Sequence, residues 1–467
     1  MRLLTVLTLV VLSFFVEAQG HRIQFNVLGF KDSIAYLANP YAGKQYIADT
    51  ILPNADGDYI LEGKDTIPPG VYMFVNAEKQ FLFQFVIDEQ RFTLSTMAKD
   101  PTNKMMVTDS PQNKYFFDYW KYVGNLYQEM SELKVKEDEK SKKRIEELNT
   151  KVSAFRTEFM ESYPDEFITK LLKLAEEPKI PEELNGNDSL RYEYYKKHYF
   201  DNIDFSDGRL VRSPLLHDKL MRYLDKMIVP DPDTIVKEVR YVIELAEADP
   251  MMYQYVVSQL AYKYEASKQM CVDKVFYDIV DRHFKTGRAT WVDEVQMAKI
   301  LQRGKDLKPC RCGMTGNNLI MQDTTGQFIP LHEVKADYTV VVFWSSTCGH
   351  CKSMIPKLKK FHEDYKSSGV EVYGVNIEDE SEGYKKYINK MDLDYINVQD
   401  TTHATYFRYY YNVYMTPVIY LLDKDKKIVG KQLAVDSVAK LIDQLRDEYD
   451  EKKDYNIYYV PSGKDKH

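Results

Sequence analysis

The sequence predicts a multidomain protein with three folded parts: an N-terminal all-β sandwich or barrel, a central all-α domain and a C-terminal α/β domain. Three observations predict this order. Hydrophobic residues alternate with polar ones between about residues 23 and 97, and they recur with helical period between about residues 112 and 303. Beyond residue 318, short hydrophobic strands alternate with helical segments, as in a mixed α/β sheet. The 467 residues suffice for about three domains, each with its own core.

The first residues have the pattern of a secretory signal peptide. A basic residue precedes a hydrophobic run over residues 3–16, and Glu17-Ala18-Gln19 follows, so we expect cleavage after Ala18. The alternative is a membrane anchor, but about 14 apolar residues are few for a membrane-spanning helix. We therefore expect residues 1–18 to be removed and the rest to be secreted across the inner membrane.

Residues 19–105 form the predicted β domain. Short alternating runs such as Ile23–Val27 and Phe81–Ile87 are separated by turn signals at residues 54–58 and 68–70. Short strands with frequent turns indicate a small antiparallel sandwich or barrel. No set of residues in this part suggests catalysis.

Residues 106–305 form the predicted helical domain. The helical period is clear in residues 151–160 and 234–246, and prolines between such stretches stop the predicted helices. We therefore expect several antiparallel helices in this part of the chain.

The predicted C-terminal domain, residues 306–450, is organised around one strand and the dithiol that follows it. Residues 340–344 predict a buried strand, and the motif Cys-Gly-His-Cys at residues 348–351 opens a segment with helical periodicity. Unpaired backbone N–H groups and the helix dipole stabilise a thiolate at a helix N-terminus. We therefore expect Cys348 to be the nucleophile and Cys351 to be the resolving thiol.

A zinc site is the main alternative for a Cys-x-x-Cys motif. Such a site needs a second pair of ligands at suitable spacing. The sequence contains no second Cys-x-x-Cys and no matching pair of histidines. We therefore expect neither a metal nor a cofactor.

The residues around the dithiol resemble those of the thioredoxin superfamily, and more closely its TlpA/ResA-like branch. The resemblance lies in Trp344, four residues before the first cysteine, in Thr416-Pro417 and in a predicted helical insertion over residues 381–390. It extends over roughly residues 318–445. The β domain more loosely resembles the small β domain that often precedes a thioredoxin module in exported proteins of Bacteroidota.

The resemblance implies a C-terminal thioredoxin fold with a redox-active Cys348–Cys351 disulfide. It also implies that Pro417 is cis and lies against the dithiol, and that the backbone of Thr416 pairs with a substrate peptide. The substrate-binding residues implied in this way are Trp344, Gly349, Thr416 and Pro417.

The two residues between the cysteines, Gly349-His350, match the dipeptide of protein disulfide isomerase. A charged histidine beside the Cys348 sulfur stabilises the thiolate, which favours the reduced form and makes the disulfide more oxidising. We therefore include His350 among the catalytic residues. We expect a potential nearer to the isomerase value of about −180 mV than to the thioredoxin value of about −270 mV.

One position departs from the thioredoxin pattern. Val342 stands where thioredoxins bury a carboxylate beneath the dithiol. A base must still remove the proton from Cys351 in the resolving step. The nearest acidic residues in the sequence are Glu378, Asp379 and Glu380, although three acids in a row also fit a solvated loop.

Cys271, Cys310 and Cys312 lie outside the motif. Disulfides persist in exported proteins, so these cysteines are candidates for pairing. The Cys310-Arg311-Cys312 segment fits a second redox pair, a shuttle to the main pair, or a tether to Cys271. We favour a linker disulfide without catalytic consequence.

These features predict an exported, periplasmic thiol–disulfide oxidoreductase. Its partners would be thiol- or disulfide-containing envelope proteins and a membrane or soluble redox donor, and the sequence decides neither the direction of electron flow nor the oligomeric state. The alternative is an envelope binding or assembly protein in which the thioredoxin module is accessory. The formal net charge of −8 argues against a nucleic-acid partner. We expect the polar residues 451–467 to be disordered.

Overall fold

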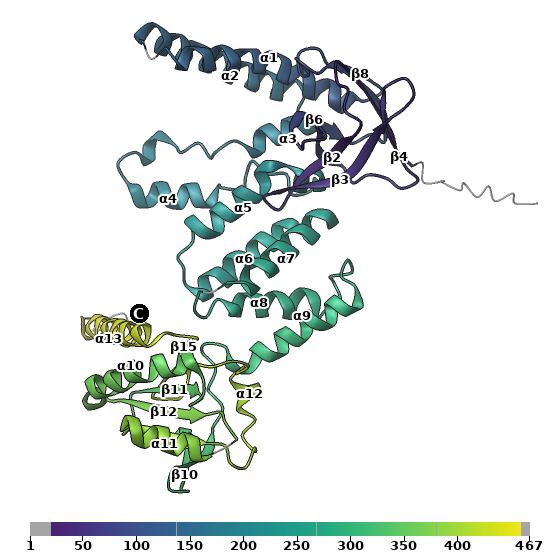
Figure 1. Cartoon of the computed structure of the whole chain (residues 1–467). Helices are drawn as coiled ribbons and strands as arrows, with labels where there is room; N and C mark the ends of the chain where they lie inside the picture. Colours follow the sequence, from purple (N-terminus) through teal and green to yellow (C-terminus); the bar gives the residue numbers. More distant parts are fainter. Residues whose placement is uncertain (1–19, 137, 268, 380, 459–467) are drawn as a thin grey trace, which may run out of the picture. The chain divides into compact units, whose positions relative to one another are not determined.

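The computed structural model describes residues 20–136, 138–267, 269–379 and 381–458 (Figure 1). The expected signal peptide lies outside the described residues. The chain forms two compact units. The first contains the described residues up to 228 together with 241–256, and the second contains 229–240 together with the described residues from 257 onwards. The helices expected between residues 106 and 305 are therefore divided between the two units.

The first unit contains one β-sheet of eight strands. These are β1 (Arg22–Leu28), β2 (Ala35–Tyr41), β3 (Lys44–Pro53), β4 (Tyr59–Glu62), β5 (Gly70–Val75), β6 (Phe81–Ile87), β7 (Arg91–Met97) and β8 (Met106–Thr108). Their order in the sheet is β6-β5-β2-β3-β4-β1-β7-β8. β1 and β7 run parallel, whereas the sequence predicted antiparallel pairing. The parallel pair arises because the chain leaves β6 at one edge and re-enters the sheet on the far side of β1.

Aromatic side chains fill the core beneath this sheet. Phe25, Phe74 and Phe85 are 0% exposed, and Phe83 is 2% exposed. The rings of Phe74 and Phe83 are stacked with centroids 5.2 Å apart. Each buried phenylalanine contributes roughly 1.5–3 kcal/mol to folding, which explains why the alternating pattern forms a sheet with one buried face.

Helices complete the first unit. They are α1 (Pro111–Lys134), α2 (Glu139–Ser162), α3 (Phe167–Leu174), α4 (Asp188–Lys197) and α5 (Pro214–Lys226). Two further helices, α6 (Pro232–Ala246) and α7 (Pro250–Glu265), each contribute residues to both units. Several of the prolines that interrupt the helical pattern begin the next helix, because proline at the first helical position loses no hydrogen bond.

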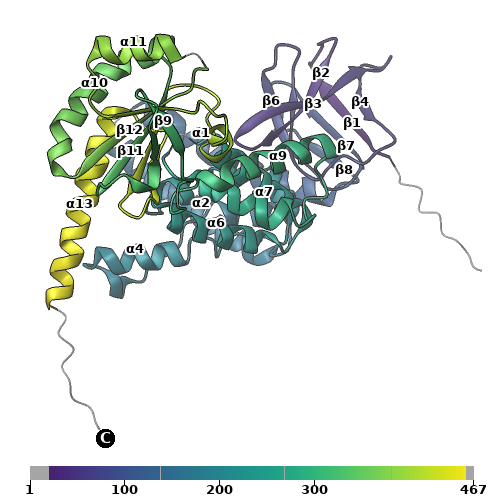
Figure 2. The same cartoon turned by 90° about the horizontal axis from the view of Figure 1, so that it is seen from below.

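In the second unit, two helices precede a mixed sheet and further helices lie between its strands (Figure 2). The helices before the sheet are α8 (Asp273–Ile279) and α9 (Glu294–Leu307). The strands are β9 (Ile320–Asp323), β10 (Phe328–Pro330), β11 (Tyr338–Trp344), β12 (Val370–Asn376), β13 (Ile396–Gln399), β14 (Val418–Asp423) and β15 (Ile428–Lys431). The helices among them are α10 (Gly349–Tyr365), α11 (Ser381–Met391), α12 (Phe407–Tyr410) and α13 (Val435–Tyr458). The strand order is β10-β9-β13-β12-β11-β14-β15.

β11 is the central strand of this sheet. It pairs in parallel with β12 and antiparallel with β14. Val340, Val342 and Trp344 pack on one face against residues of α10, α11 and α13, and Val341 and Phe343 pack on the other. All five are 0% exposed, which confirms the predicted buried strand.

The structure also describes the expected helical insertion and the closing helix. The expected insertion at residues 381–390 is helix α11. The closing helix α13 continues to Tyr458, and residues 459–467 of the expected disordered tail lie outside the described residues, so that expectation stays a prediction. No helix among the described residues is long and apolar enough to cross a membrane.

Candidate active site

Cys348 is the N-cap residue of α10, immediately after the loop that leaves the central strand. Its sulfur accepts a hydrogen bond from the backbone N–H of Cys351 at 3.5 Å. Cys348 is partly exposed and Cys351 is 0% exposed. Both are free thiols, so the structure holds the dithiol form and not the Cys348–Cys351 disulfide expected for the oxidised form.

A second loop meets the dithiol from the other side of β11. The Thr416–Pro417 peptide bond is cis. The Cys348 thiol donates to the carbonyl oxygen of Thr416 at 3.5 Å. The loop is held here because β14 starts at the next residue, Val418, and pairs with Phe343 of β11. The structure therefore brings together the Thr416-Pro417 pair and the dithiol, as the resemblance implied.

The two thiols differ in acidity. Burial alone would raise the pKa of Cys348, but hydrogen bonds from the backbone and side chain of Cys351 outweigh it and lower the pKa below its usual value. Burial raises the pKa of Cys351 to about 11. Of the two thiols, Cys348 is therefore the one that loses its proton more readily, the property required of the nucleophile in such a pair.

His350 and Gly349 are both exposed. The backbone N–H of His350 also contributes to the lowered pKa of Cys348. The imidazole ring has no hydrogen-bond or ion-pair partner among the described residues. Space is open around Gly349, since a Cβ atom there would meet nothing within 4 Å. This side of the dithiol is therefore accessible to another molecule.

Trp344 is buried, whereas the resemblance implied that it binds substrate. It is 0% exposed, and its ring packs against Tyr384 and Tyr387 of α11 with centroids 5.8 and 5.7 Å away. A side chain that is fully covered does not contact a substrate. We therefore reassign Trp344 from substrate binding to support beneath the dithiol loop.

The carboxylate of Glu378 organises the loop between β11 and α10. It accepts hydrogen bonds from the hydroxyls of Ser345 and Ser346, both at 2.7 Å. It also accepts the backbone N–H of Thr347 at 2.9 Å and the side-chain amide of Asn376 at 3.1 Å. Sequence reasoning named this residue but missed its role; the signal was its place directly after β12, the parallel neighbour of β11.

These contacts exclude Glu378 as the base that removes the proton from Cys351. Burial alone would raise its pKa, but the surrounding donors lower it to about 2. Such a carboxylate holds a proton poorly, and its oxygens are already occupied by loop donors. Glu378 is therefore a positioning residue for the loop and not the base for Cys351.

Apolar side chains flank the cis-proline loop. Tyr414 is 67% exposed and Met415 is 77% exposed, and both directly precede Thr416. Tyr406, near α12, is 71% exposed. Sequence reasoning did not assign these residues to the site. Because large exposed apolar side chains often mark contact surfaces, they are candidates for contact with a substrate protein.

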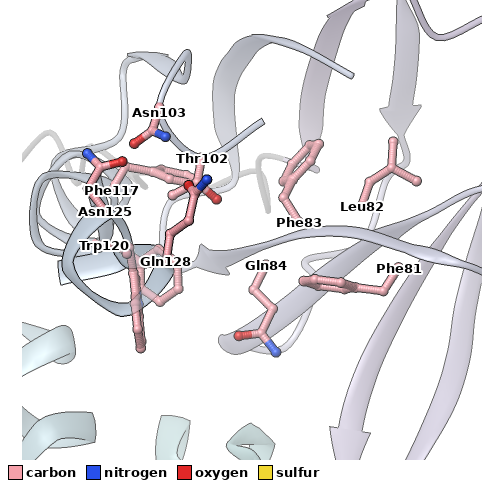
Figure 3. A pocket seen from close by; sticks show the side chains of 12 residues that line it. Phe81, Leu82, Phe83, Gln84, Thr102, Asn103, Phe117, Trp120, Asn125 and Gln128 are labelled. Atoms are coloured by element: carbon pink, nitrogen blue, oxygen red, sulfur yellow. The ribbon is translucent and has the colours of Figure 1, made fainter. Parts of the chain in front are cut away.

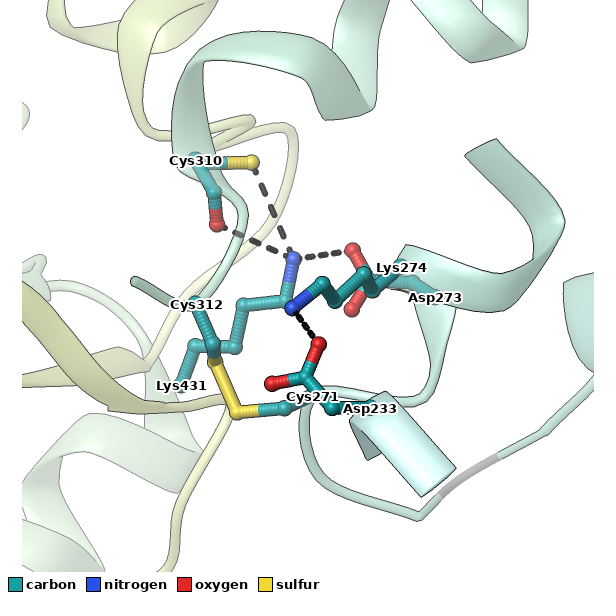
Figure 4. Close-up of a disulfide and its surroundings, with 7 residues drawn as sticks. All are labelled: Asp233, Cys271, Asp273, Lys274, Cys310, Cys312 and Lys431. Carbon is teal, nitrogen blue, oxygen red and sulfur yellow. Dashed lines mark hydrogen bonds and ion pairs between the residues drawn. A yellow bond between two sulfur atoms is a disulfide. The ribbon is translucent and has the colours of Figure 1, made fainter. Parts of the chain in front are cut away.

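The remaining cysteines form a separate cluster (Figure 4). Cys271 and Cys312 are joined in a disulfide, which is the tether considered from the sequence. Cys310 is a free, fully buried thiol, so the Cys310-x-Cys312 segment is not a disulfide pair here. Lys431 donates to the backbone oxygen of Cys310 at 3.1 Å and forms an ion pair with Asp273.

No group of three potential metal-binding side chains occurs in the part of the chain that the structure describes.

Two family models match the chain. One, the AhpC/TSA family, matches residues 313–431. The other, a domain of unknown function (DUF5106), matches residues 131–308. The first match covers the sheet and the dithiol, and the second covers most of the helices.

Curated relatives match about a quarter of the chain. Thiol-disulfide oxidoreductase ResA of a Bacillus cereus strain is 26% identical over 126 residues, which cover 27% of this chain and 72% of the relative. ResA of Bacillus subtilis is 26% identical over 117 residues, which cover 25% of this chain and 64% of the relative.

Solved structures are similar as well. A domain of a possible thiol-disulfide isomerase from Cytophaga hutchinsonii is 35% identical, with a TM-score of 0.30, and the match covers 31% of this chain and 98% of that one. A thioredoxin-like protein from Bacteroides caccae is 19% identical, with a TM-score of 0.45, and the match covers 57% of this chain and 97% of that one.

A buried central strand, a dithiol at the start of the following helix and a cis-proline loop against it define a thioredoxin-like domain. The AhpC/TSA match and the similarity to ResA agree with this: the C-terminal part of the chain is a thioredoxin-like domain of the TlpA/ResA-like type.

Proposed function

We propose that the protein is an exported, periplasmic thiol–disulfide oxidoreductase that exchanges disulfides with envelope proteins through its Cys-Gly-His-Cys dithiol. One observation carries the proposal. The sulfur of Cys348 has a lowered pKa, is partly exposed, and lies 3.5 Å from both the N–H of Cys351 and the carbonyl of Thr416. A nucleophile, its resolving thiol and a backbone contact for a substrate are thus in one place.

In the reducing direction, the Cys348 thiolate attacks one sulfur of a substrate disulfide. The substrate S–S bond breaks, and the first substrate sulfur departs as a thiolate. Cys351 then gives its proton to that thiolate and attacks the Cys348 sulfur, which breaks the mixed disulfide and releases the second substrate sulfur as a thiolate. The substrate gains two electrons and the enzyme keeps the Cys348–Cys351 disulfide. A membrane or soluble dithiol donor returns it to the reduced form.

Cys351 must lose its proton in the resolving step, so its pKa must fall once the substrate is attached. Part of its raised pKa comes from the neighbouring Cys348 charge. The mixed disulfide removes that charge, so the pKa of Cys351 falls when the substrate is attached. The substrate thiolate that departs first lies near the Cys351 sulfur and takes its proton. No carboxylate is therefore needed as the base.

Contact with the substrate falls to the surface around the exposed sulfur. The carbonyl group of Thr416 contacts Cys348, Pro417 follows it through the cis peptide bond, and Gly349 leaves room for a polypeptide to approach. The His350 ring, when charged, stabilises the thiolate and makes the couple more oxidising. Residues 306–450 carry this chemistry, residues 19–105 form the small sandwich- or barrel-like β domain, and residues 106–305 supply the helices.

Insulin reduction tests the proposal. The wild-type protein should reduce insulin with a thiol donor, and Cys348→Ser should abolish turnover while the far-ultraviolet circular dichroism stays unchanged. Cys310→Ala, which removes a free thiol outside the motif, should keep turnover. Cys351→Ala should accumulate mixed disulfides with client proteins in envelope extracts. A folded wild-type protein without turnover would instead favour a binding or assembly protein with an accessory thioredoxin module.

A further inference from the structure

Strand β6 is an edge of the eight-stranded sheet, with β5 on one side only. At its C-terminal end, one side chain occupies the open edge. Asn113 of α1 donates to the backbone oxygen of Val86 at 2.7 Å and accepts the backbone N–H of Val86 at 2.8 Å. These are the two bonds that a neighbouring strand would make, so the edge is capped at this residue.

The cap does not extend further along the strand. Backbone groups that point to one edge recur at every second residue of a strand, so the N–H and C=O of Gln84 face the same way as those of Val86. No described residue pairs with these outward groups of Gln84. An unpaired edge of this kind is a template for an added strand.

A cavity of about 350 Å³ adjoins this open stretch (Figure 3). Four consecutive residues of β6 line it, from Phe81 to Gln84. Asn113 places α1 on the side of β6 that faces away from β5, and residues of α1 form another wall of the cavity. The cavity therefore lies on the edge side of the strand, where an added strand would run.

The other walls come from α1 and the turn before β8. They are aromatic or uncharged and comprise Thr102, Asn103, Phe116, Phe117, Trp120, Gly124, Asn125 and Gln128. The amide nitrogens of Asn103 and Asn125 already donate within the protein, to Asp100 and to the backbone of Lys121. Their amide oxygens are left as acceptors beside the cavity. The lining suits an uncharged apolar group with N–H donors near it.

Gly124 supports the view that the cavity is kept open. It lies inside α1, where glycine is among the least favourable residues. Its backbone is not left-handed, and a Cβ atom there would meet nothing within 4 Å, so neither backbone geometry nor packing requires glycine. The space that a side chain would enter is the cavity that Gly124 lines.

We infer that the first unit binds an extended peptide segment that pairs with the free edge of β6 beside Gln84 and places one uncharged apolar side chain in the adjoining cavity. Backbone pairing supplies affinity and the cavity supplies selectivity, as in other cases of strand addition. A neutral sugar fits the aromatic lining, but it would leave the backbone edge unpaired. The open edge therefore favours a polypeptide.

Fluorescence anisotropy with a labelled, capped octapeptide of alternating threonine and phenylalanine tests this inference on the full mature chain. Saturable binding is expected. The same peptide with N-methyl groups on alternate backbone nitrogens should bind at least 10-fold more weakly, because it cannot form the ladder. Equal binding of the two peptides would overturn strand addition.

Two substitutions on α1 provide the matched comparison on the protein. Gly124→Leu fills the cavity and improves helix propensity, so it should fold at least as well and weaken peptide binding at least 10-fold. Asp118→Leu adds the same side chain at an exposed position of α1 that does not line the cavity, and it should leave binding unchanged. Unchanged binding to folded Gly124→Leu would contradict the inference.

Hydrogen exchange locates the bound peptide directly. Saturating peptide should slow exchange of the Gln84 amide, and Cys348→Ser should show the same protection because the site does not use the dithiol. Loss of insulin reduction with intact peptide binding would therefore contradict the proposed function but not this inference. Absence of protection at β6, or competition by maltotetraose in place of peptide, would reject a peptide site.

Discussion

Cys348 owes its acidity to backbone groups more than to a neighbouring cationic side chain. The donors that lower its pKa are mainly the N–H groups at the start of α10, and the exposed ring of His350 has no partner among the described residues. A helix N-terminus offers such N–H groups whatever side chains it carries. The residue between the cysteines therefore acts on the thiolate in two separable ways, through its amide and through its ring.

Substitutions of His350 separate these two effects. His350→Pro removes the backbone N–H and should raise the pKa of Cys348, whereas His350→Ala keeps that N–H and should change the pKa less. The measurement is thiolate absorbance at 240 nm against pH, with Cys348→Ser as the blank. If alanine raises the pKa as much as proline does, the charged ring and not the amide stabilises the thiolate.

Glu378 is the second residue whose environment makes a sharp prediction. Its pKa is about 2 in the folded protein against an ordinary value of 4.5. A carboxyl group with a lowered folded pKa stabilises the fold fully above the unfolded pKa, and that contribution is lost as the pH falls towards the folded pKa. The dithiol loop should therefore lose stability between about pH 4.5 and pH 2.

Glu378→Gln tests this dependence. The neutral amide cannot accept the same set of donors, so we expect a loss of about 1–3 kcal/mol in unfolding free energy at pH 7. The loss should shrink as the pH is lowered through the acidic range, because the wild-type carboxylate becomes protonated there. Urea titrations at a series of pH values measure both trends. A pH-independent difference would show that shape, and not charge, holds the loop.

At the scale of elements, the catalytic helix is tied to the sheet by a buried histidine. His362 of α10 is 1% exposed and contacts Glu371 of β12 at 2.9 Å and Asp394 at 3.2 Å. Lys366 also contacts Asp394. Burial alone would lower the pKa of His362, but the two carboxylates outweigh it and raise the pKa above 6.5. The tie is therefore strongest when the imidazole is charged.

The sign of the pH effect is opposite to that of Glu378. A raised folded pKa gives stability that is complete below the unfolded pKa of about 6.5 and is lost as the pH rises through the folded value. His362→Gln should destabilise the protein by about 1–3 kcal/mol at pH 6 and less at pH 9. Thermal unfolding at both pH values measures this. The matched control is His332→Gln, a histidine substitution outside this contact.

Elements near the dithiol were predictable because their signals are local. The hydrophobic run of β11, the cysteines that open α10 and the Thr416-Pro417 pair each mark their own structure. Burial of Trp344 beneath α11 and the contacts of Glu378 depend on how separate elements meet, and no local pattern encodes that. The parallel pairing of β1 with β7 could not be predicted from the sequence for the same reason.

At the scale of the whole molecule, the helices just before the expected border near residue 305 are joined closely to the thioredoxin-like domain. The change near residue 305 predicted a domain border, but α8 and α9 belong to the same compact unit as the mixed sheet. The Cys271–Cys312 disulfide joins the residues just before α8 to those just before β9. Lys431 of β15 and Asp273 of α8 add an ion pair to this connection.

We predict that removing this disulfide lowers the stability of the second unit but leaves turnover intact. The bond closes a sequence separation of 41 residues. Restricting an unfolded loop of this size contributes about 2–4 kcal/mol to stability. Cys271→Ser combined with Cys312→Ser should therefore lower the midpoint of urea unfolding of the second unit.

Turnover should survive in that double variant under conditions where the protein stays folded, because neither residue touches the Cys348 sulfur. Insulin reduction and urea unfolding measured on one preparation decide the matter. Cys310→Ser removes the adjacent free thiol but leaves the loop closed, so its unfolding should lack the loop-closure loss. If the double variant is as stable as the wild-type protein but reduces insulin poorly, the Cys271–Cys312 pair takes part in electron transfer and is more than a linker.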